Sequence, residues 1–179
     1  MTHILIVESS VDNLEVAQFV YLLLNNTKIR EVIDTITSKA VLILGRFTPE
    51  RKRTLDALRD ALRARNYVPI EFDFEKPANR DFTETVSTLA HLARFVIADL
   101  TDPRSIPQEL MAIIPQLQSV PIRPLLLGSQ SEWSMFRDLS RRVQVIEPFH
   151  YTDDQMLLNC LVSDVIEPAE RRARELAGR

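Results

Sequence analysis

The chain has 179 residues, of which 45% are hydrophobic and 26% charged, and its formal net charge is −3. This length provides for one domain with a substantial core, and the composition excludes a disordered or membrane-embedded chain. A slightly acidic chain is not suited to neutralising many phosphates, so no nucleic-acid partner is expected. The three glycines, Gly45, Gly128 and Gly178, lie too far apart for a GxGxxG fingerprint or a GxxxxGK[ST] loop, which excludes ordinary Rossmann dehydrogenases and P-loop NTPases.

Residues that commonly bind metals are sparse. Cys160 is the sole cysteine, and His3, His91 and His150 lie far apart in the sequence. This excludes an internal disulfide and a thiolate zinc cluster, and we expect neither a metal site nor a bound cofactor. Residues 4–7 form an apolar run that is much too short for a signal-peptide core or a membrane span. We therefore expect a cytoplasmic protein without a membrane partner.

Residues 1–38 predict a helical extension that stands apart from the alternating pattern that follows. Asp12 and Glu15 can cap one helix, and residues 29–36 predict a second. Residues 3–9 predict an additional strand. We expect this extension to pack on the core or to contribute to an oligomer interface.

Residues 39–167 alternate between apolar strands and amphipathic helices. The predicted strands are residues 40–44, 67–72, 95–98, 122–127 and 143–146. The predicted helices are residues 49–65, 81–93, a short helix from Ser105, residues 132–139, and a last helix from Thr152. This alternation predicts an α/β, flavodoxin-like, doubly wound five-stranded parallel sheet with strand order 2-1-3-4-5. Pro69 favours an edge position for the second strand. Residues 168–179 are expected to form a charged tail that frays.

A ligand site is expected beyond the carboxyl ends of the strands, where the strand order reverses. The first strand leads into Arg46 and Phe47, and the third ends at Asp99 and is followed by Thr101. The second strand leads to Asp73 and Phe74 at the neighbouring rim of the sheet. Topology therefore predicts that Arg46, Phe47, Asp99 and Thr101 meet in one crevice, with Asp73 and Phe74 at its rim.

Glu109 is predicted to point into the same crevice. It falls in the first turn of the helix that Ser105 caps, where backbone N–H groups and the helix dipole favour a carboxylate. Carboxylates, a guanidinium and aromatic rings together suit cleavage of a sugar–base bond, at which a carboxylate stabilises or traps an oxocarbenium-like centre.

Purely structural interpretations of these residues remain open. Glu109 can serve only the helix dipole, and Asp99 can stabilise a turn. Arg46 can pair with Glu50 or Asp73, and Phe47 and Phe74 can cover the edge of the core. The run of charged residues at 51–53 is expected to solvate its helix, and Tyr151 is expected to cover the sheet edge rather than to stack on a ligand.

Two motifs carry a resemblance to a known group of proteins. Residues 95–101 read FVIADLT, and residues 107–110 read PQEL. Over roughly residues 40–128 the chain resembles nucleoside 2-deoxyribosyltransferases and related bacterial TIR-like domains, in which a strand ending in IADLT leads to a helix starting with ELG. The resemblance implies the same doubly wound fold. It also implies that Glu109 is the catalytic carboxylate, that Asp99 is the strand-end acid, and that residues 45–47 form the ligand-lining first loop. Met111 stands where these families have glycine, and the first loop lacks their usual serine or glycine richness.

The leading hypothesis is a TIR-like signalling or defence module that binds NAD or a related nucleotide as substrate and cleaves its N-glycosidic bond. Glu109 and Asp99 are then the catalytic residues, and Arg46, Phe47, Asp73, Phe74 and Thr101 bind the nucleotide. The alternative is a non-catalytic TIR-like scaffold that acts by self-association, which Met111 favours. A nucleoside deoxyribosyltransferase is a third interpretation. The resemblance further implies homo-oligomers, or partners that carry other TIR-like or sensor domains.

Overall fold

The computed structural model of the chain describes residues 25–73, 82–101, 113–128 and 140–178, together with Gln18, Tyr21, Leu22, Leu110 and Asp138. The helices are α2 (Thr27–Lys39), α3 (Pro49–Arg63), α4 (Phe82–His91), α7 (Asp154–Asn159), the π-helix η1 (Leu161–Ile166) and α8 (Glu167–Ala177). The strands are β1 (Ala40–Gly45), β2 (Val68–Asp73), β3 (Phe95–Asp99), β4 (Ile122–Leu127) and β5 (Phe149–Tyr151). The chain divides into two compact units, residues 1–35 and 36–179, and the second contains the sheet.

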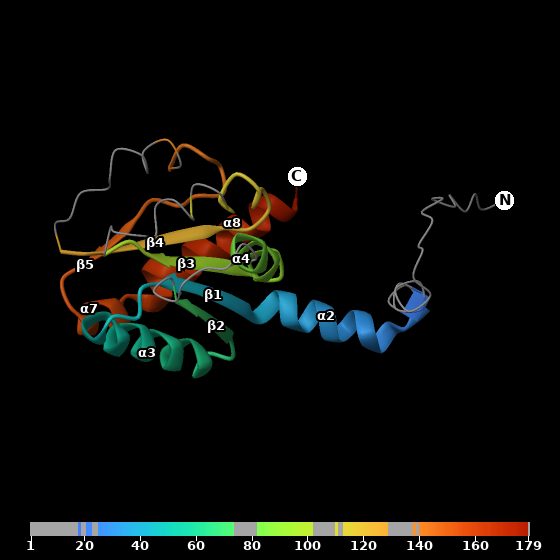
Figure 1. The fold of residues 1–179 in the computed structure, drawn as a ribbon, viewed down its shortest axis with the longest axis horizontal. Helices are drawn as coiled ribbons and strands as arrows, with labels where there is room; N and C mark the ends of the chain where they lie inside the picture. The colour runs from blue at the N-terminus through green and yellow to red at the C-terminus, as the bar shows by residue number, and fades with distance from the viewer. Residues whose placement is uncertain are drawn as a thin grey trace. The chain divides into compact units, whose positions relative to one another are not determined.

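The five strands form one parallel sheet in the order β2-β1-β3-β4-β5 (Figure 1). This confirms the predicted flavodoxin-like α/β fold and its strand order. The strand that contains Pro69 lies at the edge of the sheet, as predicted, where the missing N–H group is tolerated.

Apolar residues on alternate sides of the strands form two core layers, one on each face of the sheet. Leu42 and Leu44 belong to the layer that contains α4 side chains, together with Leu110 and residues from 113 to 120. Val41 and Ile43 belong to the layer formed with α3, α7, η1 and α8. Helices on both faces explain why every residue of β1 is buried, since a strand covered twice has no solvent-facing side.

The fifth strand differs from its prediction. Residues 143–146 are not the strand. Val145 makes an isolated bridge to Ile122, and Val143 is 40% exposed. β5 instead begins at Phe149, and both Phe149 and Tyr151 are buried in the core.

The C-terminal segment also differs from its prediction, because α8 is a helix and its residues pack on the core. Ala169 and Ala173, one turn apart, are buried and allow the helix to approach the sheet closely. The charged side chains occupy its other faces. The average composition of this segment is strongly polar, which predicts a fraying tail. The narrow stripe of buried alanines becomes evident only when the helical spacing is considered.

Other predicted elements have mixed outcomes. The helix predicted for residues 29–36 is confirmed, since it lies within α2. The strand predicted for residues 3–9 lies outside the described residues, as does the start of the helix at Ser105 and most of the helix predicted for 132–139. Within the described parts of the chain, no helix has the length and apolar character needed to cross a membrane.

Candidate functional site

The strand order reverses between β1 and β3, as in other doubly wound sheets. The chain passes from β1 outward to β2 and then returns to β3 on the other side of β1. The last residue of β1, Gly45, lies against side chains of α3 and β3. A Cβ atom at Gly45 would lie 3.1 Å from Leu55 Cδ1 and 3.5 Å from Asp99 Cβ. Gly45 therefore allows α3 and Asp99 to lie directly against the end of β1.

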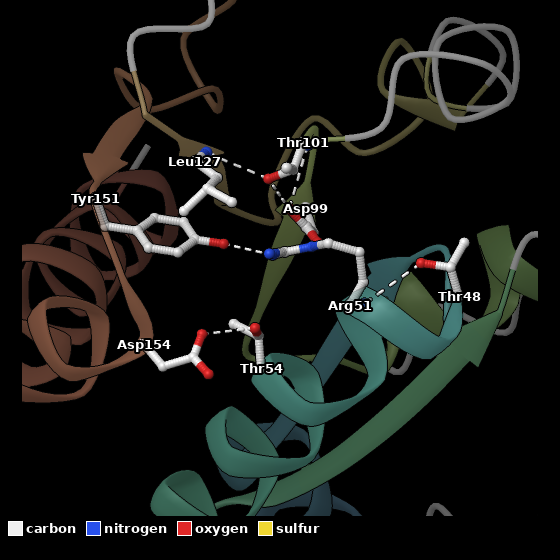
Figure 2. Close-up of polar contacts among 8 residues, drawn as sticks. All are labelled: Thr48, Arg51, Thr54, Asp99, Thr101, Leu127, Tyr151 and Asp154. Atoms are coloured by element: carbon white, nitrogen blue, oxygen red, sulfur yellow. Dashed lines mark hydrogen bonds and ion pairs between the residues drawn. The ribbon is translucent and has the colours of Figure 1, made fainter.

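A buried ion pair occupies this point of the sheet (Figure 2). Arg51, from the first turn of α3, donates from Nε and Nη2 to Asp99 Oδ2 over 3.0 and 2.8 Å. The Arg51 side chain is 10% exposed and that of Asp99 is 2% exposed. Charge-assisted hydrogen bonds of this bidentate kind are stronger than those between neutral groups, and they fix both side chains in one geometry.

The second oxygen of Asp99 is also engaged. Asp99 Oδ1 accepts from the backbone N–H of Thr101 at 3.2 Å and from its hydroxyl at 2.6 Å. The hydroxyl oxygen of Thr101 in turn accepts from the N–H of Leu127 at 3.2 Å. These contacts tie the end of β3 to the end of β4. With both oxygens accepting, Asp99 is suited to holding neighbouring groups in place.

Tyr151 completes the buried network from the far edge of the sheet. Its hydroxyl oxygen accepts a hydrogen bond from Arg51 Nη2, and its ring centroid lies 5.9 Å from the Arg51 guanidinium carbon. Burial raises the pKa of the Tyr151 phenol, and the Asp99 carboxylate raises it further, while Arg51 opposes both. Burial lowers the pKa of Arg51, but Asp99 and then Tyr151 outweigh that effect and the pKa is raised. The neutral phenol and the charged guanidinium are therefore the stable forms.

The first loop is held from the neighbouring strand. Asp73 Oδ1, at the end of β2, accepts from the N–H of Phe47 at 3.1 Å. Phe47 is half-buried and packs against the core layer that contains α3. Thr48 caps α3, since its hydroxyl oxygen accepts from the N–H of Arg51 at 3.3 Å. The loop that carries Arg46 is thus fixed at both of its ends.

A further contact fastens α3 to α7 below the ion pair. The hydroxyl of Thr54 donates to Asp154 Oδ1 at 2.6 Å, and Figure 2 shows this contact beside Arg51. Asp153 caps the same end of α7 by accepting from the N–H of Met156. The Met156 contact lowers the pKa of Asp153, and the Thr152 hydroxyl lowers it further.

Five of the seven residues predicted for the site can be placed. The structure brings Asp99 and Thr101 into direct contact and pairs Asp73 with the backbone of Phe47, and Arg46 lies in the same loop. Glu109 and Phe74 lie outside the described residues, as does Met111. Within the described parts of the chain, no cluster of three or more residues is arranged to hold a metal ion.

Arg51 is the residue that the sequence interpretation placed wrongly. It was expected to solvate the helix with its neighbours, but only Lys52 and Arg53 are exposed. The missed signal is its spacing, because Arg51 precedes Leu55, Leu58 and Leu62 on the same helical stripe. An arginine on the buried side of a helix needs an anion nearby. When the adjacent strand ends in aspartate, this pattern predicts a buried ion pair.

Comparison with solved structures supports the fold. The chain is similar to a CMP N-glycosidase from Clostridium botulinum, with a TM-score of 0.55 and 16% identity over 70% of this chain and 98% of that one. It is also similar to a diflavin flavoprotein A3 from Nostoc sp., with a TM-score of 0.49 and 13% identity over 76% and 96% of the two chains. No family model matches the sequence, and no curated protein does either.

Proposed function

We propose that the chain is a TIR-like module that binds a nucleotide at the carboxyl ends of β1 and β3 and hydrolyses its N-glycosidic bond. The observation that carries the proposal is the buried Arg51–Asp99 pair at the reversal of strand order, where doubly wound folds bind their ligands. The N-glycosidase activity named for the Clostridium botulinum protein, which shares this fold, supports the choice of reaction.

In the proposed reaction the bond between C1′ of the ribose and the base nitrogen breaks, and water adds to C1′. The leaving base takes the bonding electrons, and one hydrogen of the water stays on the new C1′ hydroxyl. Its other proton goes to the base when the base is cytosine, and is released when neutral nicotinamide leaves NAD. Glu109 stabilises the positive charge that develops at C1′ or captures that carbon. Arg46 meets the phosphate, and Phe47 or Phe74 stacks on the base. Asp99, held by Arg51, fixes the strand end from which the chain leads to Glu109.

A scaffold that acts by self-association is the second candidate, and α2 favours it. This helix has no buried residue, and its apolar side chains Val32 and Ile36 are 57% and 46% exposed. An amphipathic helix whose apolar side chains remain exposed is a feature of interaction surfaces. In this alternative the chain associates with a second copy or with another TIR-like domain, and Glu109 has no role.

The two candidates separate in one experiment. Purified protein at high concentration is incubated with CMP, other nucleoside monophosphates and NAD, and release of the free base is followed by chromatography. We expect release with at least one substrate, and a fall of at least 100-fold in Glu109→Gln. The matched control is Glu167→Gln, which makes the same change at an exposed position in the first turn of α8 and should keep full activity. Full activity in Glu109→Gln would overturn the catalytic assignment of this residue. If no base is released from any substrate, the hydrolase proposal fails and the self-associating scaffold is favoured.

A further inference from the structure

The opposite edge of the sheet, away from the candidate nucleotide site, is concave. A cleft of about 330 Å³ is lined by Arg123 of β4, by Ile146 and Glu147 before β5, and by four residues of α8. Those four are Pro168, Arg171, Arg172 and Glu175. Their spacing of three, one and three residues places them on one side of the helix. The volume falls at the lower end of the range for small-molecule sites.

Arg123 lies at the floor of this cleft and is 8% exposed. Its Nη1 and Nη2 donate to the backbone carbonyls of Glu147 and Asp164. The second contact has a sequence cause, because Pro168 has no N–H to offer the carbonyl of Asp164 four residues earlier. Arg123 supplies that donor and so joins β4 to η1. Its guanidinium also lies 5.9 Å from the Phe149 ring centroid.

Both of these hydrogen bonds go to uncharged oxygens. Within the described parts of the chain, Arg123 forms no ion pair, and its buried Nε finds no hydrogen-bond partner. Burial lowers the pKa of Arg123, and the carboxylates of Asp164 and Glu147 offset that only in part. A buried guanidinium without a contacting anion is unusual, since buried charges in proteins are paired. This contrasts with Arg51, which is equally buried and contacts Asp99 directly.

The rim of the cleft adds charge of the same sign. Arg172 is neutralised by Glu175, with 3.0 Å between Nε and Oε2. Arg171 is exposed beside it, so Arg171 and Arg123 face the cleft against the single carboxylate of Glu147. The cleft therefore has a surplus of positive charge, together with one carboxylate that can accept a hydrogen bond from a ligand.

We infer that this cleft binds a small molecule carrying one oxyanion group, a carboxylate or a phosphate, and a hydrogen-bond donor. The oxyanion lies between Arg123 and Arg171 and supplies the contacting anion that Arg123 lacks among the described residues. The donor group, a hydroxyl or an amine, faces Glu147. The site lies at the amino ends of β4 and β5, so it is distinct from the nucleotide site and does not depend on catalysis there.

Thermal unfolding of the purified full chain tests this inference. Inorganic phosphate and malate are titrated separately at constant ionic strength, with sodium chloride as the balancing salt. We expect a saturable rise in Tm with at least one of them. If the rise in Tm saturates with phosphate but not with malate, the ligand is a phosphorylated molecule. If it saturates with malate but not with phosphate, the ligand is a hydroxy-carboxylate.

Two variants on α8 show where the anion binds. Arg171→Gln removes the exposed charge at the cleft and should weaken the apparent affinity at least tenfold. Arg174→Gln makes the same change on the same helix but outside the cleft, and its affinity should stay within twofold of the parent. The inference is overturned if neither anion gives a saturable rise, or if the two variants lose affinity equally, because equal loss means only general attraction to charge.

Discussion

At the scale of single residues, Arg51 carries most of the local chemistry of the candidate site. It contacts Asp99 through two nitrogen atoms, and one of these also reaches Tyr151. These partners come from β3 and β5, so one side chain of α3 fastens strands that are not neighbours in the sheet. Buried pairs of this kind add little net free energy compared with apolar packing, but they are costly to break, because the remaining charge is left without its partner.

Replacing Arg51 by methionine should therefore lower the free energy of unfolding by about 3–5 kcal/mol, since Asp99 would remain buried without a cation. Urea-induced unfolding followed by circular dichroism measures the change. Arg53→Met, an equal loss of charge at an exposed position two residues later, should change stability by no more than about 0.5 kcal/mol. Equal losses in the two variants would contradict the account of the ion pair.

Some of the contacts around these residues could be predicted from the sequence, and others could not. The strand ends fixed the neighbourhood of Asp99 and Thr101, because parallel strands bring their carboxyl ends to one edge. Arg51 was missed because three consecutive basic residues look like a solvated surface when their helical phase is ignored. The contact between Asp73 and the Phe47 backbone could not be predicted, since it depends on the path of a loop rather than on a periodic pattern.

At the scale of elements, α8 is held to the amino ends of two strands by one carboxylate. Glu170 accepts from Arg94 Nη2 at 2.8 Å, directly before β3, and from the Tyr67 hydroxyl at 3.2 Å, directly before β2. The Tyr67 ring meets Phe95 edge-on, with centroids 5.6 Å apart. These contacts of Glu170 could not be predicted from the charge composition. They form only when α8 is positioned by its buried alanines.

This attachment predicts a pH dependence. Burial raises the pKa of Tyr67 to about 12, and the Glu170 carboxylate adds to that effect. The ordinary value for tyrosine is about 10, so folding favours the neutral phenol. The stability that Tyr67 contributes is therefore fully present below about pH 10 and is lost as the pH rises through about 12.

Absorbance at 295 nm, compared between the parent and Tyr67→Phe, isolates the titration of this phenol. At pH 11 the folded parent should show little phenolate from Tyr67, whereas in urea the same residue should ionise near pH 10. The difference in unfolding free energy between the two proteins should shrink over the same range. A folded-state midpoint near 10 would mean that Tyr67 is not buried against Glu170.

The apolar pattern of the sequence predicts some of the strands correctly and misplaces one. Continuous apolar runs identified β1 and β3, because strands covered on both faces have no polar side, and an apolar run that contains Arg123 identified β4. The last strand was placed several residues too early. β5 is only three residues long and lies at an edge, and burial of Phe149 and Tyr151 rather than apolar periodicity determines its start.

At the scale of the whole molecule, strand order is the feature that organises both proposed sites. The alternation of strands and helices limits the sheet to a few topologies, and the observed order places one reversal between β1 and β3. The nucleotide is proposed to bind at the carboxyl edge of that reversal, and a small oxyanion at the amino edge under α8. The second site had no sequence signal, because it depends on Arg123 within an otherwise apolar strand meeting a helix that was expected to be a tail.

Nitrogen–proton correlation NMR of the labelled full chain, titrated with CMP and with NAD, tests the central claim most directly, because it locates a nucleotide whether or not the bond is cleaved. The largest amide shift changes should occur in residues 45–48, at Asp73 and in residues 99–101. Residues that line the cleft beside α8 should change no more with a nucleotide than they do with inorganic phosphate alone. Absence of any saturable change with either nucleotide, or changes confined to α2 or to the α8 cleft, would contradict a nucleotide site at the carboxyl ends of β1 and β3.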